Sequence, residues 1–188
     1  YSMGSDDGFI GDIVVVVGFD ADKVYKTLPD SVRVVENENF ESTGPARSIS
    51  LGIKATISKR VLIVYGDLVF NKETFENLPE ESCVIVDSKG RMDSSEVGVN
   101  IDSGNVVHFD YGLKTKWCHC ILLTGKELAL FKIISSHLDK RKFSGHEILN
   151  SIIEKGGEFK AVEPKKMKLI EVDSNKDLER TNSIIWKS

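Results

Sequence analysis

The chain has 188 residues, of which 40% are hydrophobic and 29% are charged. These values are typical of globular proteins and favour neither a fibrous nor a disordered class, and the length suits one domain over residues 1–188 with a sizeable core. The formal net charge is −4. Because binding to nucleic acid requires clustered positive charge, this balance disfavours nucleic acid as a partner.

The cysteines and the apolar runs indicate the cellular setting. The three cysteines cannot all pair within the chain, and the sequence contains no signal peptide and no apolar run of about 18 residues. We therefore expect a protein of the reducing cytoplasm that has no membrane partner. The sequence leaves the oligomeric state open.

Strands and helices alternate over the first 90 residues. The run IVVVV at 13–17 is continuously β-branched, which is typical of a strand buried on both faces of a parallel sheet. An amphipathic helix is expected where Ile49, Ile53 and Ile57 recur every four positions. This alternation predicts an α/β fold with a doubly wound, mostly parallel sheet. Further strands are expected at 32–35, 61–65 and 82–87, and shorter helices at 20–28 and 72–78.

The middle of the chain changes to an antiparallel pattern. Two short alternating runs within 97–110 are separated by Asp102-Ser103-Gly104-Asn105, which predicts a hairpin and therefore a small antiparallel insertion at the sheet edge. The remaining expected elements are strands at 117–123 and 168–172 and helices at 126–136, 146–154 and 175–185.

The run WCHC raises the question of a zinc site. In a strand, Cys118 and Cys120 point to one face and His119 points to the other. No CxxC pair or second ligand cluster accompanies them, so we do not expect zinc. The helix sequence HEILN also lacks the second histidine of the HExxH zinc motif, because Asn150 occupies that position.

Two carboxylates stand at strand ends. Asp67 follows the apolar strand VLIVY and Gly66, and Asp173 follows KLIEV. Ligands of an open parallel sheet bind beyond the carboxyl ends of its strands, so both side chains are placed to share a divalent cation, with Mg²⁺ favoured because it accepts one or two carboxylates. The alternative is a turn or helix-capping role, which suits Asp173 better because apolar residues follow Asp67.

Four segments resemble, in order, the successive blocks of the nucleoside-triphosphate transferase superfamily. Within it, the sequence is most similar to sugar-1-phosphate nucleotidyltransferases and phosphocholine cytidylyltransferases. The segments are IVVVVGFDADKV, VENENFESTGPARSISLGI, VLIVYGDLVF and KLIEVDSNKDLERTN, so the resemblance extends from Ile13 to Asn182.

The resemblance implies a Rossmann-like sheet and a Mg²⁺-dependent enzyme that transfers a nucleotidyl group from an NTP onto a small phosphorylated acceptor and releases pyrophosphate. The acceptor phosphate attacks the α-phosphorus directly, so catalysis requires positioning and electrostatics but no nucleophilic side chain. The resemblance also implies that Asp67 and Asp173 bind Mg²⁺ and that the loop at 42–50 approaches the nucleobase. The nucleotide-binding residues expected from it are Arg47, Ser48 and Gly66.

The acceptor pocket is expected between the strand at 117–123 and the helix at 146–154. Lys116 would orient the acceptor phosphate. Trp117 or Tyr111 would present an aromatic face to a cationic group such as choline, whereas Glu147 and Asn150 would bind a sugar through polar contacts. Hydrophobic packing of the two rings and the helix dipole at Glu147 are alternative explanations. A sugar 1-phosphate is favoured over phosphocholine because that branch of the superfamily is broader.

The glycine-rich phosphate loop of the superfamily would lie ahead of Tyr1. The chain is therefore expected to be the later part of a longer polypeptide. One other candidate function is a non-catalytic nucleotide- or sugar-binding module of the same fold without that loop. A glycosyltransferase is a third candidate, but it would prefer an Asp-x-Asp cluster, and DAD at 20–22 is explained as a helix cap.

Overall fold

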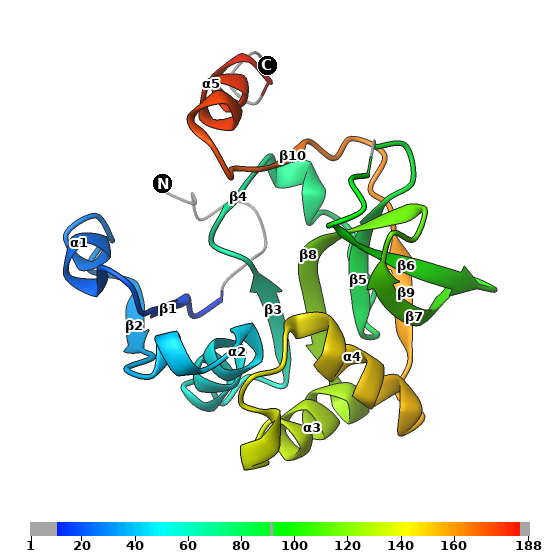
Figure 1. Cartoon of the computed structure of the whole chain (residues 1–188), viewed down its shortest axis with the longest axis horizontal. Coiled ribbons are helices and arrows are strands. Elements are labelled where there is room, and N and C mark those ends of the chain that lie inside the picture. The colour runs from blue at the N-terminus through cyan, green and yellow to red at the C-terminus, as the bar shows by residue number, and fades with distance from the viewer. Residues whose placement is uncertain (1–10, 91, 185–188) are drawn as a thin grey trace.

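The computed structural model describes residues 11–90 and 92–184, which form a mixed α/β fold (Figure 1). The elements in chain order are β1 (Val14–Val17), α1 (Ala21–Tyr25), β2 (Arg33–Glu36), α2 (Pro45–Lys54), β3 (Arg60–Val64), β4 (Leu68–Phe70), β5 (Cys83–Asp87), β6 (Val97–Asp102), β7 (Asn105–Tyr111), β8 (Thr115–Thr124), α3 (Gly125–Ile134), α4 (Gly145–Glu154), β9 (Phe159–Val162), β10 (Leu169–Glu171) and α5 (Asn175–Ile184).

The largest sheet is mixed, with the strand order β3-β8-β5-β9-β7-β6. Strand β8 lies between β3 and β5 and runs antiparallel to both, while β5 and β9 are parallel. The prediction of a mostly parallel sheet is therefore wrong. The continuous apolar run of β5 reflects burial on both faces, and a central strand of a mixed sheet is buried in the same way as a strand of a parallel sheet.

The antiparallel segment expected in the middle of the chain is the hairpin β6–β7, but it does not lie at a sheet edge. Strand β6 also pairs with β8, and β7 also pairs with β9, so the pairings of β8, β5, β9, β7 and β6 form a closed circuit. Ser103 and Gly104 in the turn have φ angles of 48° and 81°. Two-residue hairpin turns of this kind need positive φ at both positions.

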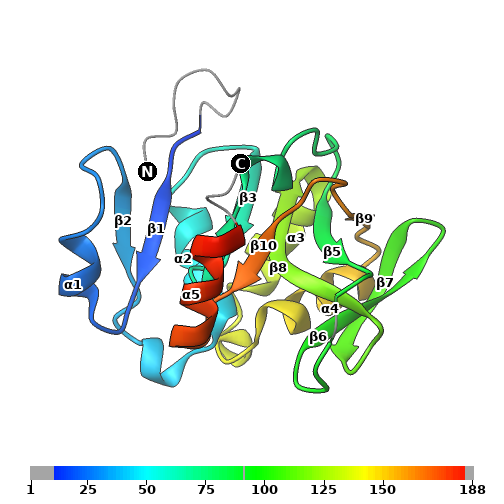
Figure 2. The same cartoon turned by 90° about the horizontal axis from the view of Figure 1, so that it is seen from above.

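Two strand pairs lie outside the six-stranded sheet. Strands β1 and β2 are parallel and form a separate two-stranded sheet on one side of the molecule (Figure 2). Strands β4 and β10 pair antiparallel, although β4 follows β3 closely in the chain and β10 comes about a hundred residues later. Asp67 immediately precedes β4, and Asp173 lies two residues after the end of β10.

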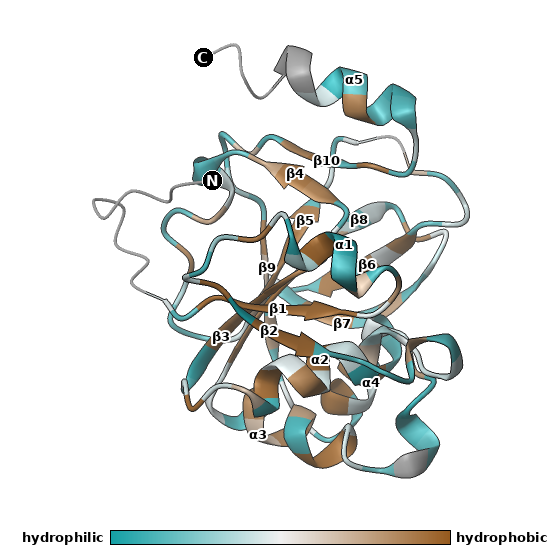
Figure 3. Ribbon diagram, turned by 90° about the vertical axis from the view of Figure 1, so that its left-hand side faces the viewer, coloured by the Kyte–Doolittle hydropathy of each residue, from teal (hydrophilic) through white to brown (hydrophobic). Residues whose placement is uncertain are grey.

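The core has two parts, one on each face of the six-stranded sheet. Helices α2, α3 and α4 cover one face (Figure 1), where Ile53, Phe131 and Ile148 belong to one hydrophobic cluster with sheet residues such as Phe109. A smaller cluster around Ile85, Cys118 and Cys120 lies under Leu68 and Leu169 of β4 and β10. Figure 3 shows that β5 is predominantly hydrophobic, as its burial on both faces requires.

Three local predictions differ from the structure. Helix α1 ends at Tyr25, before the predicted end, and the segment 72–78 contains the 3-10 helix Lys72–Thr74 where a short α-helix was predicted. Helix α2 ends at Lys54, so Ile57 lies beyond it and is fully exposed. The four-residue spacing of Ile57 is therefore incidental. Ile185, at the predicted end of the last helix, lies outside the described residues.

None of the helices within residues 11–90 and 92–184 is long and apolar enough to cross a membrane.

Candidate functional site

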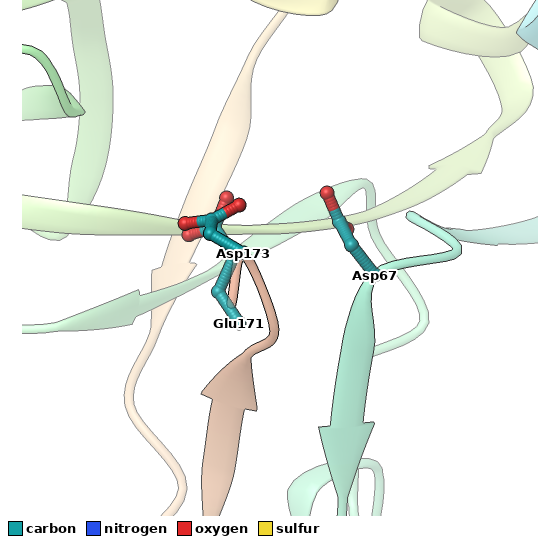
Figure 4. A group of neighbouring side chains, drawn as sticks. All are labelled: Asp67, Glu171 and Asp173. Atoms are coloured by element: carbon teal, nitrogen blue, oxygen red, sulfur yellow. The ribbon is translucent and has the colours of Figure 1, made fainter. Parts of the chain in front are cut away.

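The structure brings Asp67 and Asp173 together and places Glu171 beside them. One carboxylate oxygen of each residue lies within 4.8 Å of a carboxylate oxygen of each of the other two. The side chains project from adjacent ends of β4 and β10 (Figure 4), where Asp67 and Asp173 are exposed and Glu171 is half-buried. This arrangement offers several oxygen ligands to one cation.

The pairing of β4 with β10 explains why these carboxylates meet. In this antiparallel pair Leu68 is opposite Glu171, so the start of β4 lies beside the end of β10. The backbone N–H of Val172 donates a hydrogen bond of 2.8 Å to the carbonyl of Asp67 and extends the pairing to the two aspartates. The sequence argument placed both aspartates at the carboxyl ends of parallel strands. Asp67 and Asp173 do follow β3 and β10, but these strands belong to different sheets, so the two aspartates meet through the antiparallel pairing of β4 with β10.

Lys116 links the carboxylate cluster to the main sheet. Its Nζ forms ion pairs with Glu96, which precedes β6, and with Oε2 of Glu171 at 3.3 Å. Burial lowers the pKa of Lys116, but hydrogen bonds and charges from these carboxylates outweigh it and raise the pKa overall. Burial raises the pKa of Glu96, but the hydrogen bond from Lys116 and further contacts lower it overall. Lys116 and Glu96 are therefore both charged at neutral pH.

His119 occupies a bulge in β8. Val84 and Val86 of β5 are opposite Ile121 and Trp117, so two more residues lie between these partners on β8 than on β5. His119 sits in this bulge with a φ of 53°, a left-handed conformation that side chains other than glycine rarely adopt. Its ring stacks on Tyr65 with centroids 4.9 Å apart, and its Nδ1 lies 3.4 Å from Oε1 of Glu171.

The imidazole of His119 is neutral at neutral pH. Burial lowers its pKa, and the nearby charges of Glu171 and Asp67 do not outweigh this effect. Nδ1 is buried and has no hydrogen-bond partner of good geometry among the described residues.

A cavity of 300 Å³ adjoins Glu171 and Asp173. Rings and carboxylates dominate its walls, which makes it both aromatic and acidic. The rings are those of Tyr65, Tyr111, Trp117, His119 and His146, and the carboxylates are those of Glu96, Glu171 and Asp173.

The two aromatic residues predicted for an acceptor pocket differ in exposure. Trp117 is 1% exposed and packs edge-on against Tyr65, Phe109 and His119, so its ring belongs mainly to the core. Tyr111 is 55% exposed and lies edge-on to His146 at the cavity wall. Tyr111 is therefore the better placed of the two to contact a ligand.

The side chains of Glu147 and Asn150 are taken up by structural contacts. Glu147 forms a capping box with Ser144 at the start of α4, and its carboxylate accepts a 2.7 Å hydrogen bond from the backbone N–H of Ser144. The side chain of Asn150 bonds to the backbone N–H and carbonyl of Phe109. Neither residue lines the cavity beside Glu171. This geometry argues against the acceptor-binding roles predicted for them.

The three residues predicted to bind the nucleotide, Gly66, Ser48 and Arg47, do not line one common cavity. Gly66 is exposed next to Asp67, and the hydroxyl of Ser48 accepts a hydrogen bond from Asn37. Arg47 lines a second cavity of 350 Å³ together with Arg141 and Lys142.

Residues from two segments that are hydrogen-bonded to each other line both cavities. Gly44 N–H donates to the Arg141 carbonyl, and Ala46 N–H donates to the Phe143 carbonyl. The neighbouring residues Pro45 and Ser144 line the acidic cavity, and Thr43 and Lys142 line the cavity at Arg47.

The sequence analysis did not identify Glu171, Glu96 or Tyr65 as candidate site residues. It considered His119 only as a possible zinc ligand. A signal for Glu171 was present, because in KLIEVD it stands two residues before Asp173 and therefore on the same side of an extended chain. No local signal identified Glu96 or Tyr65, whose roles depend on contacts with distant strands.

The comparison with known proteins shows the fold. No family model matches the sequence, and no curated protein matches it either. Among solved structures, the inositol-1-phosphate CTP transferase from T. maritima aligns with a TM-score of 0.71 and 19% identity over 92% of this chain and 77% of that chain. A putative glucose-1-phosphate thymidylyltransferase from Bacillus anthracis aligns with a TM-score of 0.72 and 16% identity over 94% of this chain and 77% of that chain.

The CTP:phosphocholine cytidylyltransferase from Streptococcus pneumoniae aligns with a TM-score of 0.66 and 16% identity over 92% of this chain and 78% of that chain. The chain therefore has the fold of these nucleotidyltransferase structures, which confirms at the level of fold the resemblance stated from the sequence.

Proposed function

We propose that this chain is a Mg²⁺-dependent nucleotidyltransferase that transfers a nucleoside monophosphate from an NTP onto a small phosphorylated acceptor and releases pyrophosphate. The observation that carries the proposal is the cluster of Asp67, Glu171 and Asp173 in a chain that has the fold of nucleotidyltransferases. The three unpaired cysteines support the cytoplasmic setting expected from the sequence.

The ligands of the carboxylate cluster fit Mg²⁺. Asp67, Glu171 and Asp173 offer oxygen atoms alone, and the exposure of the two aspartates leaves room for water and phosphate oxygens. Asp67 and Asp173 would hold the ion. When bound, Mg²⁺ supplies positive charge that offsets the negative charge on the reacting phosphates.

The chain's own residues bind and orient the substrates. An oxygen of the acceptor phosphate forms the new bond to the α-phosphorus, the bond from the α-phosphorus to the bridging oxygen breaks, and pyrophosphate leaves with the electron pair. The ammonium group of Lys116 has three N–H donors, and the contacts with Glu96 and Glu171 account for two of them. The third remains for the acceptor phosphate, which supports the orienting role predicted for Lys116.

The acidic cavity supports a phosphorylated amino alcohol, such as phosphocholine, as the acceptor. The sequence favoured a sugar 1-phosphate with Glu147 and Asn150 as polar partners, but both side chains are bound to the protein itself. The cavity offers instead the exposed ring of Tyr111. Aromatic faces attract a cationic head group.

A screen of pyrophosphate release tests the function. The full-length protein is incubated with each NTP and with phosphocholine, phosphoethanolamine and several sugar 1-phosphates in the presence of Mg²⁺. We expect release with one NTP and a cationic acceptor. Binding of an NTP without turnover with any acceptor would favour the non-catalytic binding module.

Two variants test the acceptor pocket. Tyr111→Leu removes an exposed ring from the cavity wall, so it should raise KM for phosphocholine while KM for the NTP stays close to parental. Glu147→Gln changes the helix cap outside the cavity and serves as the control. If Glu147→Gln raises the acceptor KM and Tyr111→Leu does not, the sugar-binding pocket predicted from the sequence is the better description.

A further inference from the structure

The carboxylate of Glu171 is contacted by two nitrogen atoms of the same strand. Lys116 Nζ lies 3.3 Å from Oε2, and His119 Nδ1 lies 3.4 Å from Oε1, so each carboxylate oxygen has its own partner on β8. Lys116 and His119 are three residues apart, and side chains at this spacing on a regular strand point to opposite faces. The bulge at His119 therefore allows both side chains to reach one carboxylate.

The bulge keeps the imidazole in one orientation. His119 has a φ of 53°, which is unfavourable for a residue with a side chain. Its ring stacks on Tyr65 with an interplanar angle of 15° and meets Trp117 edge-on with centroids 4.7 Å apart. The side chain is 19% exposed, and Nδ1 is buried without a hydrogen-bond partner of good geometry among the described residues. Glu171 is the acceptor next to this nitrogen.

We propose that His119 is a positioning residue that holds Glu171 through Nδ1, so that Glu171 is the third carboxylate of the cation site formed with Asp67 and Asp173. Nδ1 lies 3.4 Å from Oε1 without hydrogen-bond geometry, so in the tautomer with hydrogen on Nδ1 a small shift of either side chain would let the imidazole donate to Oε1. Lys116 already donates to Oε2, and the two contacts together would fix the plane of the carboxylate. This inference rests on the cation site of the proposed function and adds to it the role of His119, which that proposal does not use.

Two substitutions distinguish the contribution of Nδ1 of His119 from the contribution of its stacked ring. His119→Phe keeps a ring that can stack on Tyr65 but removes Nδ1. His119→Asn removes the ring but retains an N–H donor near the position of Nδ1, and asparagine tolerates the left-handed backbone conformation. His108→Phe changes an exposed histidine on β7 and controls for the loss of an imidazole elsewhere.

The test measures binding of Mn²⁺ alone, without substrates, by electron paramagnetic resonance and calorimetry. Mn²⁺ prefers the same carboxylate ligands as Mg²⁺ and is directly observable. We expect His119→Phe to weaken Mn²⁺ affinity about tenfold, which is typical when a partner of a metal ligand is lost. His119→Asn and His108→Phe should keep an affinity close to parental, and the thermal midpoint without Mn²⁺ reports whether each variant is folded.

Several results would overturn the inference. If His119→Phe binds Mn²⁺ as the parent does, Nδ1 has no positioning role. If His119→Asn loses affinity while His119→Phe keeps it, the ring acts by packing alone. A parent chain that binds no Mn²⁺ overturns both this inference and the cation site of the proposed function.

The inference and the proposed function fail in different ways. A parent chain that binds Mn²⁺, responds to His119→Phe as expected and releases no pyrophosphate supports the inference and contradicts the proposed function. A parent chain that releases pyrophosphate while His119→Phe keeps full Mn²⁺ affinity contradicts the inference and supports the proposed function.

Discussion

Asn150 of α4 is bound twice to the backbone of Phe109 in β7. Its Nδ2 donates to the Phe109 carbonyl at 2.8 Å, and its Oδ1 accepts from the Phe109 N–H at 2.9 Å. The side chain therefore replaces a neighbouring strand at this point of β7 and ties the helix layer to the sheet. This role differs from the acceptor binding that the sequence suggested.

Asn150→Ala should destabilise the protein without affecting the acceptor. The substitution leaves a buried N–H and carbonyl of Phe109 without partners, and we expect the free energy of unfolding to fall by about 1–3 kcal/mol. Urea unfolding measures this change, with Asn100→Ala on the exposed part of β6 as the control. A change in acceptor KM with unaltered stability would contradict the structural role.

Asp67→Asn and Asp173→Asn should each abolish turnover while the protein stays folded. Both side chains are exposed and make few packing contacts, so the substitutions remove charge directed at the cation and leave the core intact. Pyrophosphate release measures turnover, and calorimetry measures the thermal midpoint, which should stay close to parental. Near-parental activity in either variant would refute the paired-carboxylate assignment.

Lys116→Met should lower stability in a pH-dependent manner. The substitution leaves the carboxylates of Glu96 and Glu171, which are 26% and 19% exposed, without the ammonium group that pairs with them. We expect the free energy of unfolding to fall by about 3 kcal/mol at neutral pH. This value is at the low end for a buried ion pair because both carboxylates keep some contact with solvent. Thermal midpoints of the parent and the variant measure the difference across pH. Lys114→Met, at an exposed lysine nearby, is the control.

The pH range of this effect follows from the direction of two pKa shifts. The lowered pKa of Glu96 gives stability that is present above about pH 4.3, its unfolded value, and that is lost as the pH falls through the folded value. The raised pKa of Lys116 gives stability that is present below about pH 10.4 and is lost as the pH rises through the folded value. A midpoint difference that does not shrink in acid would argue against the ion pair as its source.

Gly145→Ala should reduce activity more than stability. A β-carbon on Gly145 would overlap the hydroxyl of Tyr65 and lie 3.1 Å from Cη2 of Trp117. Because the Tyr65 ring stacks on His119, its displacement should disturb the cavity beside Glu171. Steady-state kinetics and the thermal midpoint together test this expectation, and unchanged kcat and KM would show that Tyr65 moves freely.

Local sequence patterns determined most elements of this protein. The apolar runs identified β3, β5 and β8, and the helix expected over 146–154 corresponds to α4. The position of Asp67 after Gly66 and of Asp173 after KLIEV singled out two carboxylates that the fold brings together. The predictions of these elements succeeded because each depends on residues that are close in the chain, whereas the meeting of the two carboxylates depends on the pairing of β4 with β10.

The tertiary structure decided which strands pair and in which direction. Hydrogen bonds join β8 to β3 and β5, and β4 to β10, and a run of apolar residues carries no information about the direction of such partners. The bulge that aims His119 at Glu171 interrupts the two-residue alternation from which side-chain direction is predicted. Asn150 and Glu147 appeared free in the sequence, but partners that the folded chain supplies had already engaged their polar atoms.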